Sequence, residues 1–244
     1  MLEIIAREEE WIVAVKPFGV LSEDRAEGGE GEAGMPALIR EALPEAEPGQ
    51  PSPEVRPVHR LDRTTEGLMV YALTKRAAAE LSRAVADGEF HKTYRAYLTA
   101  DPALPPSGEM RDRLFFDRRR DKAFIVPAEK ARGGAKEAIL RYTLGEPFLW
   151  RGQTVTPADI ELVTGRTHQI RAQFGARKSP ILGDGKYGSR VNYKAPSLFC
   201  TAISFPWKGR TRSFSRPADG PHADAPRADD PRADGTPGTG PAGD

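Results

Sequence analysis

An acidic residue stands among several basic ones near the centre of the segment RPVHRLDRTTEGL, which covers residues 56–68. The acid is Asp62, and the basic residues around it are Arg56, His59, Arg60 and Arg63. Nearby positive charge favours the ionised form of a carboxylate, which is the form that a nucleophile needs. The residues alone leave two interpretations open: a nucleophilic Asp62, or a surface aspartate paired with an arginine.

A second basic segment, ELVTGRTHQIR at residues 161–171, joins a turn to a short helix. Gly165 breaks the chain, and a helix is predicted over 167–176, so the basic side chains fall near its start. They are Arg166, His168 and Arg171. Free amides at a helix N-terminus, together with basic side chains, suit phosphate binding. A solvated basic helix face is the alternative that composition leaves open.

Composition is that of an ordinary globular protein, with 39% apolar and 29% charged residues among 244. Apolar runs such as 11–15 and 68–73 have the length of strands and are too short to span a bilayer. The N-terminus turns acidic at Glu8–Glu10, which is unlike a signal peptide. We therefore expect a cytoplasmic protein without a membrane partner.

Cofactor and metal motifs do not occur in the sequence. The single cysteine, Cys200, cannot form an internal disulfide or a cysteine-based zinc site, and we interpret it as a buried strand residue. The four histidines lack metal-ligand spacing, and neither dinucleotide nor phosphate-loop glycine motifs are present. We expect no cofactor and no metal.

The remaining patterns predict many strands and few helices. Strands are predicted over 11–16, 68–73, 91–98, 137–144, 158–163 and 198–205. Thr74 is an N-cap for a helix over 75–86, and Gly88 ends it. Glu- and Gly-rich 22–34 and Pro-rich 44–57 are interpreted as flexible. Strands and helices that do not alternate strictly favour the α+β class.

The last 28 residues differ from the rest. Residues 217–244 repeat Pro-x-Ala-Asp, contain no aromatic residue, and hold six Asp and two Arg. Such a segment buries too little surface to offset its ordering entropy, so it is predicted to be a disordered low-complexity tail. Its charge is −4 in a chain of net charge +1, so residues 1–216, the predicted catalytic domain, carry +5. This mildly basic balance permits a nucleic-acid partner.

Five segments taken together resemble one known family. HRLD, followed by Thr65 and Gly67, is similar to the signature of the RluA-type pseudouridine synthases. The other segments that match in the same order are VAVKPFGVL, HKTYRAYL, TGRTHQIR and SPILGDGKYG. The resemblance covers about residues 2–206.

This resemblance implies a fold, a reaction and a set of residues. The fold would be a mixed, mainly antiparallel central sheet with flanking helices and loops. Asp62 would be the nucleophile, with Tyr94 against the target base and Arg171 paired to the aspartate. RNA contacts are expected from Arg60, which would help to displace the target nucleotide, and from His59, Lys16, Arg166 and His168. The substrate would be structured ribosomal or transfer RNA, bound by a monomer.

Two other functions stay open at this point. The first is an RNA-binding module of the same fold that lacks catalysis. The second is a hydrolase that uses carboxylates, which usually needs two of them, and Glu66 is the only other acid near Asp62 in sequence. The acidic linker 23–53 and the arginine-rich segment 111–130 depart from the family pattern. These departures bear on which RNA is the substrate and not on catalysis.

Overall fold

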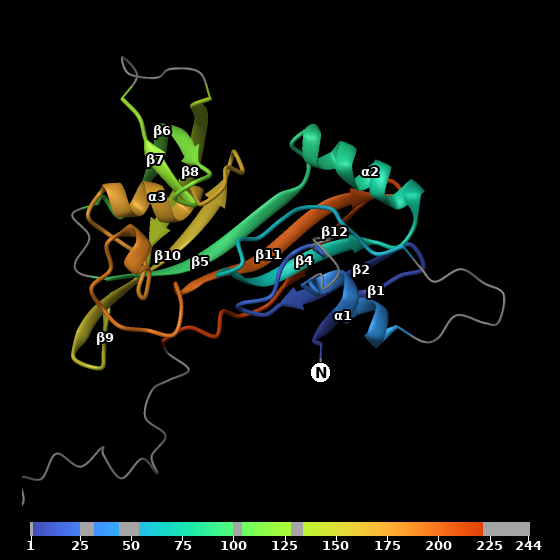
Figure 1. Cartoon of the computed structure of the whole chain (residues 1–244), viewed down its shortest axis with the longest axis horizontal. Coiled ribbons are helices and arrows are strands. Elements are labelled where there is room, and N and C mark those ends of the chain that lie inside the picture. The colour runs from blue at the N-terminus through green and yellow to red at the C-terminus, as the bar shows by residue number, and fades with distance from the viewer. Residues whose placement is uncertain (1, 25–31, 44–53, 100–103, 128–133, 222–244) are drawn as a thin grey trace, which may run out of the picture.

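A single twisted sheet runs through the molecule, as the computed structural model shows for residues 2–24, 32–43, 54–99, 104–127 and 134–221 (Figure 1). In sheet order its main path is β1 (Ile4–Arg7), β2 (Trp11–Lys16), β4 (Glu66–Ala72), β11 (Leu198–Trp207), β5 (His91–Thr99), β10 (Gln153–Leu162), β8 (Lys136–Leu144), β6 (Ser107–Asp117) and β7 (Lys122–Ile125). Three strands pair at the side of this path: β12 (Arg210–Ser215) with β11, β3 (Arg56–Pro57) with β4, and β9 (Phe148–Trp150) with β10.

Strand pairing is antiparallel except at one place in the described chain, where β4 and β11 run parallel. This arrangement confirms the predicted mixed, mainly antiparallel sheet of an α+β protein. The parallel contact depends on Gly67, whose φ is +127° and where an added Cβ would lie 2.3 Å from the Cys200 carbonyl oxygen. The close approach requires glycine, and it brings the Asp62 segment beside β11.

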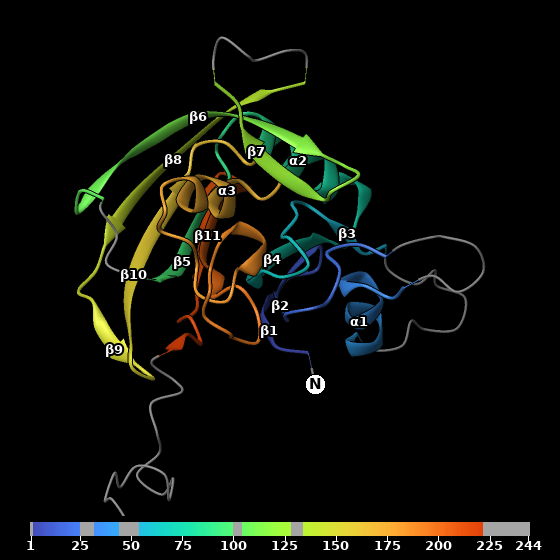
Figure 2. The same ribbon diagram turned by 60° about the vertical axis from the view of Figure 1, so that its left-hand side comes forward.

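In the part of the chain that the structure describes, three α-helices pack on the sheet. α1 (Met35–Ala42) buries Met35, Pro36 and Ile39, and α2 (Lys75–Ala86) lies over β4 and β11. The predicted cap of α2 is confirmed, because the Thr74 hydroxyl accepts a hydrogen bond from the Ala77 amide at 3.1 Å. In Figure 2, α3 (Gln169–Ala176) lies on the concave side of the curved wall formed by β6, β8 and β10.

The main hydrophobic core lies between the sheet and the helices around β2, β4 and β11. Strand β2 is buried along its full length, and Trp11 packs edge-on against Phe205 with ring centroids 5.5 Å apart. Apolar burial of this kind is the dominant stabilising contribution in a domain of this size. Cys200 is part of this core, as its apolar neighbours predicted.

The strands and helices predicted from apolar patterns are present, with shifted ends. The strand expected over 158–163 is longer, and the helix expected from Thr167 begins at Gln169. Sequence patterns did not indicate α1, β1, β3, β6, β7, β9 or β12. Most of these are short, and β6, with the sequence SGEMRDRLFFD, carries charged residues among its apolar ones.

The stretches predicted to be flexible are only partly described. Residues 25–31 and 44–53 lie outside the described residues. Ser22, at the start of the first stretch, is instead buried and fixed by hydrogen bonds, and Val55, near the end of the second, is buried. Of the predicted tail, only 217–221 are described, and there Gly220 is buried against Tyr97. The domain boundary at 216 stays a prediction.

Candidate active site

A cavity of about 930 Å³ opens where the Asp62 loop, β5 and the start of α3 meet. Its lining includes Asp62, Tyr94 and Arg171 from the expected catalytic set, and Arg60, Arg166 and His168 from the expected RNA-binding set. Segments from residue 21 to residue 198 of the chain thus converge on one space. This convergence makes the cavity the candidate active site.

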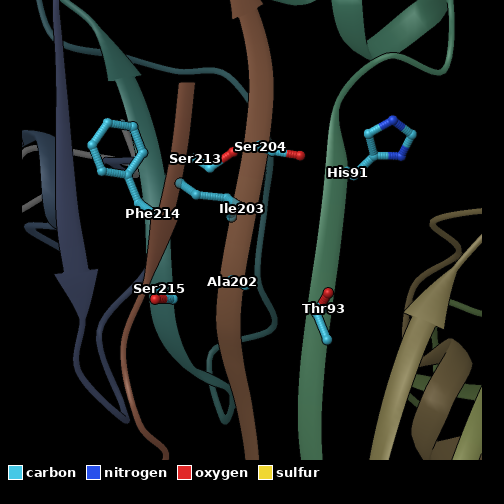
Figure 3. A pocket seen from close by; sticks show the side chains of 8 residues that line it. All are labelled: His91, Thr93, Ala202, Ile203, Ser204, Ser213, Phe214 and Ser215. Atoms are coloured by element: carbon cyan, nitrogen blue, oxygen red, sulfur yellow. The ribbon is translucent and has the colours of Figure 1, made fainter. Parts of the chain in front are cut away.

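A smaller cavity of about 280 Å³ lies on the other face of the sheet. Figure 3 shows its lining on three strands: His91 and Thr93 on β5, residues 202–204 on β11, and residues 213–215 on β12. His91 and Thr93 alternate along β5 with Lys92 and Tyr94, which line the larger cavity, so the two cavities occupy opposite faces. None of the expected catalytic residues lines the smaller one.

Backbone contacts hold the loop that carries Asp62 between β3 and β4. The Ser22 hydroxyl donates to the Leu61 carbonyl at 2.8 Å and accepts from the Leu61 amide at 3.1 Å. The Thr65 amide donates to the Asp62 carbonyl, and the Gly19 amide donates to the Arg63 carbonyl, each at 2.9 Å. The loop is therefore rigid enough to aim one carboxylate into the cavity, where 23% of the Asp62 side chain is exposed.

Lys16 belongs to this scaffold, which corrects the expected contact with RNA. It is fully buried, and its ammonium donates to the carbonyls of Pro17, Val20 and Arg63 at 2.8–3.2 Å. Burial lowers the pKa of Lys16 to about 8. All three donors are used inside the protein, so Lys16 supports the Asp62 loop and does not reach a phosphate.

His59 is likewise placed away from the cavity. Its side chain is buried against Phe90, with ring centroids 5.0 Å apart, and its Nε2 accepts from the Val70 amide at 3.3 Å. Burial lowers the pKa of His59 well below its ordinary value, so the ring is neutral. A neutral, buried imidazole does not serve as an RNA-binding residue, which corrects that expectation.

Arg171 lies at the floor of the cavity, with only 4% of its side chain exposed. Its Nε and Nη2 donate to the two carboxylate oxygens of Asp184 at 2.7 and 2.8 Å, while its Nη1 lies 3.9 Å from Asp62 Oδ2. Burial disfavours the charge on Arg171, but Asp184 outweighs it and leaves the pKa raised. The expected pairing with Asp62 is thus present as a long ion pair, and the bidentate partner is Asp184.

Tyr94 forms another part of the floor. It lies on β5 between Cys200 of β11 and Ile160 of β10, and 4% of it is exposed. Burial, followed by the influence of Cys200 and Asp62, raises the pKa of Tyr94 well above its ordinary value. The phenol therefore stays protonated beside the carboxylate.

His168 also faces Asp62, with its Nε2 3.8 Å from the Asp62 Oδ2. Its Nδ1 lies 3.0 Å from the Tyr187 hydroxyl, and that hydroxyl accepts from the Ala123 amide at 2.8 Å. Burial lowers the pKa of His168 and raises that of Tyr187 to about 12. Two groups, His168 and Arg171, therefore approach the same carboxylate oxygen of Asp62.

Exposed arginines form the rim of the cavity. Arg60 is 74% exposed and lies 3.3 Å from Glu23, and Arg166 donates to the Glu137 carbonyl at 2.8 Å. Arg118 joins them from the turn between β6 and β7. Together with Arg63, which also lines the cavity and is 54% exposed, these side chains are described cations of the site that a nucleic acid can contact directly.

Sequence reasoning missed several residues of the site. Asp184 and Tyr187 fall within the fifth matched segment, SPILGDGKYG, but their contacts with Arg171 and His168 required the fold. Lys92 lines the cavity two residues before Tyr94 in the segment HKTYRAYL, and the alternation of a strand could have placed it there. Burial lowers the pKa of Lys92.

Within the described residues, no group of three or more histidine, cysteine or acidic side chains is arranged to hold a metal ion. The helices of that part of the chain are all too short or too polar to cross a membrane.

Comparison with solved structures places the fold in a known class. The human RNA pseudouridylate synthase domain containing 1 superposes with a TM-score of 0.74 over 89% of this chain and 83% of its own, at 21% identity. At that identity the likeness concerns the fold alone. The arrangement of sheet and helices is that of the pseudouridine synthases.

The sequence comparisons define the family. The model of the RNA pseudouridylate synthase family matches residues 10–176. The dual-specificity RNA pseudouridine synthase RluA of Escherichia coli is 32% identical over 224 residues, which cover 89% of this chain and 94% of that protein. An uncharacterized RNA pseudouridine synthase of Haemophilus influenzae is 31% identical over 196 residues, 78% of this chain and 75% of that one. The chain belongs to the RluA-type branch of the RNA pseudouridylate synthase family and is an isomerase.

Proposed function

We propose that this protein converts uridine to pseudouridine in structured ribosomal or transfer RNA, with Asp62 as the nucleophile and Tyr94 and Arg171 as its catalytic partners. The observation that carries the proposal is the placement of Asp62. It is a partly exposed carboxylate at a cavity of nucleotide size, faced by Arg171 at 3.9 Å and His168 at 3.8 Å, with Tyr94 in the same lining.

The reaction breaks the bond between C1′ of the ribose and N1 of uracil, turns the base, and joins C1′ to C5. C5 loses a proton and N1 gains one, so substrate and product are isomers and no oxidant or reductant is consumed. Attack at either the sugar or the base requires the ionised carboxylate of Asp62, and the guanidinium of Arg171 lies 3.9 Å from it.

A uridine inside an RNA stem or loop must leave its stack to enter the cavity, at a cost of a few kcal/mol. Arg60 is exposed at the rim, where its planar guanidinium is free to occupy the vacated stack. Tyr94 on the floor offers an aromatic surface to the flipped base, and such stacking is worth roughly 1–3 kcal/mol. The rim thus serves to displace the target nucleotide from its stack, and the floor binds the flipped base.

Phosphate contacts are assigned to the exposed arginines Arg60, Arg118 and Arg166. Neutralising phosphates releases counterions, so RNA affinity should fall steeply as salt rises. The name of the Escherichia coli relative, a dual-specificity enzyme, supports testing more than one class of RNA.

The alternative of a carboxylate-based hydrolase is not supported. Glu66 does not line the cavity and lies 3.6 Å from Arg216. The other acids of the lining each lie beside a cation: Glu23 beside Arg60 and Asp121 beside Lys186. Among the described residues, each lining acid other than Asp62 is therefore offset by a cation, whereas a carboxylate-based hydrolase usually needs a second acid that acts with the first.

The test is incubation of the protein with ribosomal and transfer RNA from cells that lack its gene. We expect pseudouridine to appear at a small number of sites with the wild-type protein and at none with Asp62→Ala. RNA that is bound but never modified by the wild type would favour the inactive binding module and would overturn the proposal. The cytoplasmic location and the monomeric state stay predictions.

A further inference from the structure

His168 occupies an unusual backbone position immediately before α3. Its φ and ψ are +56° and +22°, in the left-handed region, where residues other than glycine are uncommon. The side chain is 8% exposed and is held between the rings of Phe116 and Tyr187, both edge-on at 5.6 and 5.8 Å. Positions of this kind persist only where the surrounding structure enforces them, and they cluster at functional sites.

The contact with Tyr187 determines which ring nitrogen of His168 carries the proton. The Tyr187 oxygen accepts from the Ala123 amide at 2.8 Å, which leaves its own O–H to donate. Donation to Nδ1, 3.0 Å away, places the imidazole proton on Nε2. The reverse arrangement would direct the Nε2 lone pair at the Asp62 carboxylate, which is repulsive. The favoured tautomer therefore presents an N–H to Asp62.

Tyr187 supports the second neighbour of Asp62 as well. The Arg171 guanidinium lies over the Tyr187 ring, 5.0 Å from its centroid, while its fork is held by Asp184. Tyr187 thus contacts both groups that approach Asp62 Oδ2. Among the described residues no hydrogen bond reaches either carboxylate oxygen, so Oδ1 is left to the substrate.

We propose that His168, held in its Nε2–H tautomer by Tyr187, is a positioning residue that orients the Asp62 carboxylate for attack. The inference rests on the proposed role of Asp62 as the nucleophile. It replaces the expected RNA contact of His168 with an action through Asp62, since the buried ring is directed at that side chain rather than at the exposed rim. The other charged groups around the imidazole are Arg171, Asp121 and Lys186.

Two substitutions separate the contacts of the ring. In His168→Gln the side-chain amide nitrogen falls near the position of Nε2, which keeps an N–H toward Asp62 and loses Tyr187. In His168→Asn the shorter amide falls near Nδ1, which keeps Tyr187 and loses Asp62. Asparagine tolerates the left-handed backbone better than glutamine, so a merely structural role predicts Asn to be the better replacement.

The positioning role predicts the opposite order for turnover. We expect kcat of His168→Asn to fall by about 10- to 100-fold, because a misaimed carboxylate is costly. His168→Gln should keep kcat within about fivefold of wild type, with KM unchanged in both. The melting temperature of His168→Gln should nevertheless be lower than that of His168→Asn. A kcat of His168→Asn equal to or above that of His168→Gln would overturn the inference.

A second measurement does not depend on activity. The nitrogen chemical shifts of the His168 ring, assigned by their loss in His168→Gln, report its tautomer in the free protein. We expect Nε2–H at pH 7, and a further lowering of the His168 pKa in Asp62→Asn, since the aspartate charge favours the imidazolium. An Nδ1–H ring, or an unchanged titration, would overturn the contact even if Asp62 proves to be the nucleophile. If the His168 ring behaves as expected but Asp62→Ala remains active, only the proposed role of Asp62 as the nucleophile is contradicted.

Discussion

The floor and the rim of the cavity are built from the same residue types in opposite ways. On the floor, Arg171 is 4% exposed and is bound through two hydrogen bonds by Asp184, which is 1% exposed and does not itself line the cavity. On the rim, Arg60 is 74% exposed and meets Glu23 through one contact of 3.3 Å. Buried pairs hold a fixed geometry, while exposed pairs contribute little and exchange partners readily. The floor thus fixes one carboxylate, and the rim supplies charge that can adapt to RNA.

The largest expected effect comes from breaking the floor pair. Asp184→Asn leaves the Arg171 guanidinium buried without its bidentate partner, and such a change typically costs about 3–5 kcal/mol of stability. Because Nη1 of Arg171 would no longer be aimed at Asp62, kcat should fall by about 100-fold as well. Urea denaturation and single-turnover rates measure the two effects.

The matched control is Asp159→Asn. Asp159 also accepts two hydrogen bonds from one arginine, Arg95, at 2.6 and 2.9 Å, but it is 52% exposed and does not line the cavity. We expect a loss of less than about 1 kcal/mol and normal turnover. Equal losses in the two variants would remove the distinction between a buried and an exposed ion pair.

A smaller effect concerns Lys16 beneath the floor. Its pKa is about 8 in the folded protein, below the ordinary value of 10.5. Between these values the unfolded chain binds the extra proton, so stability should rise as pH increases from 8 to 10.5. The shift corresponds to about 3 kcal/mol at most. Denaturation of wild type and Lys16→Met across this pH range isolates the contribution of Lys16 to the free energy of unfolding. Parallel dependences of that free energy on pH in the two proteins would contradict the prediction.

The smallest effect is expected at the rim. Arg166→Ala should weaken RNA binding by less than about tenfold and reduce the salt slope of log K by about one, as the loss of one phosphate contact does. Lys16→Met is the control, because a buried lysine leaves the slope unchanged. A reduced slope for Lys16→Met, or an unchanged one for Arg166→Ala, would reverse the assignment of these two residues.

The sequence predicted the strands of the core, but it did not reveal the contacts that depend on burial. Apolar patterns located β2, β4, β5 and β11, because a buried strand must carry such residues wherever it packs. Basic residue type suggested that Lys16 and His59 bind RNA, yet both are buried and used internally. Residue type does not reveal whether a cation faces solvent or closes a loop.

Asp184 and Tyr187 illustrate a different gap. Both fall in a segment that matched the family, yet neither was assigned a role, because their partners lie 13 and 19 residues away, across a turn of backbone. The short helix α1 was missed because glycine-rich and proline-rich stretches enclose it, although Met35 and Ile39 have helical spacing. Contacts of this kind follow from the fold rather than from local pattern.

The central claim is that a fixed Asp62 carboxylate performs the chemistry while the rim binds the RNA. Single-turnover pseudouridine formation and RNA affinity, measured together for wild type and Asp62→Asn, test it most directly. We expect the rate to fall by at least about 1000-fold, as for other lost nucleophiles, with affinity changed less than about threefold. A rate within tenfold of wild type would contradict the account.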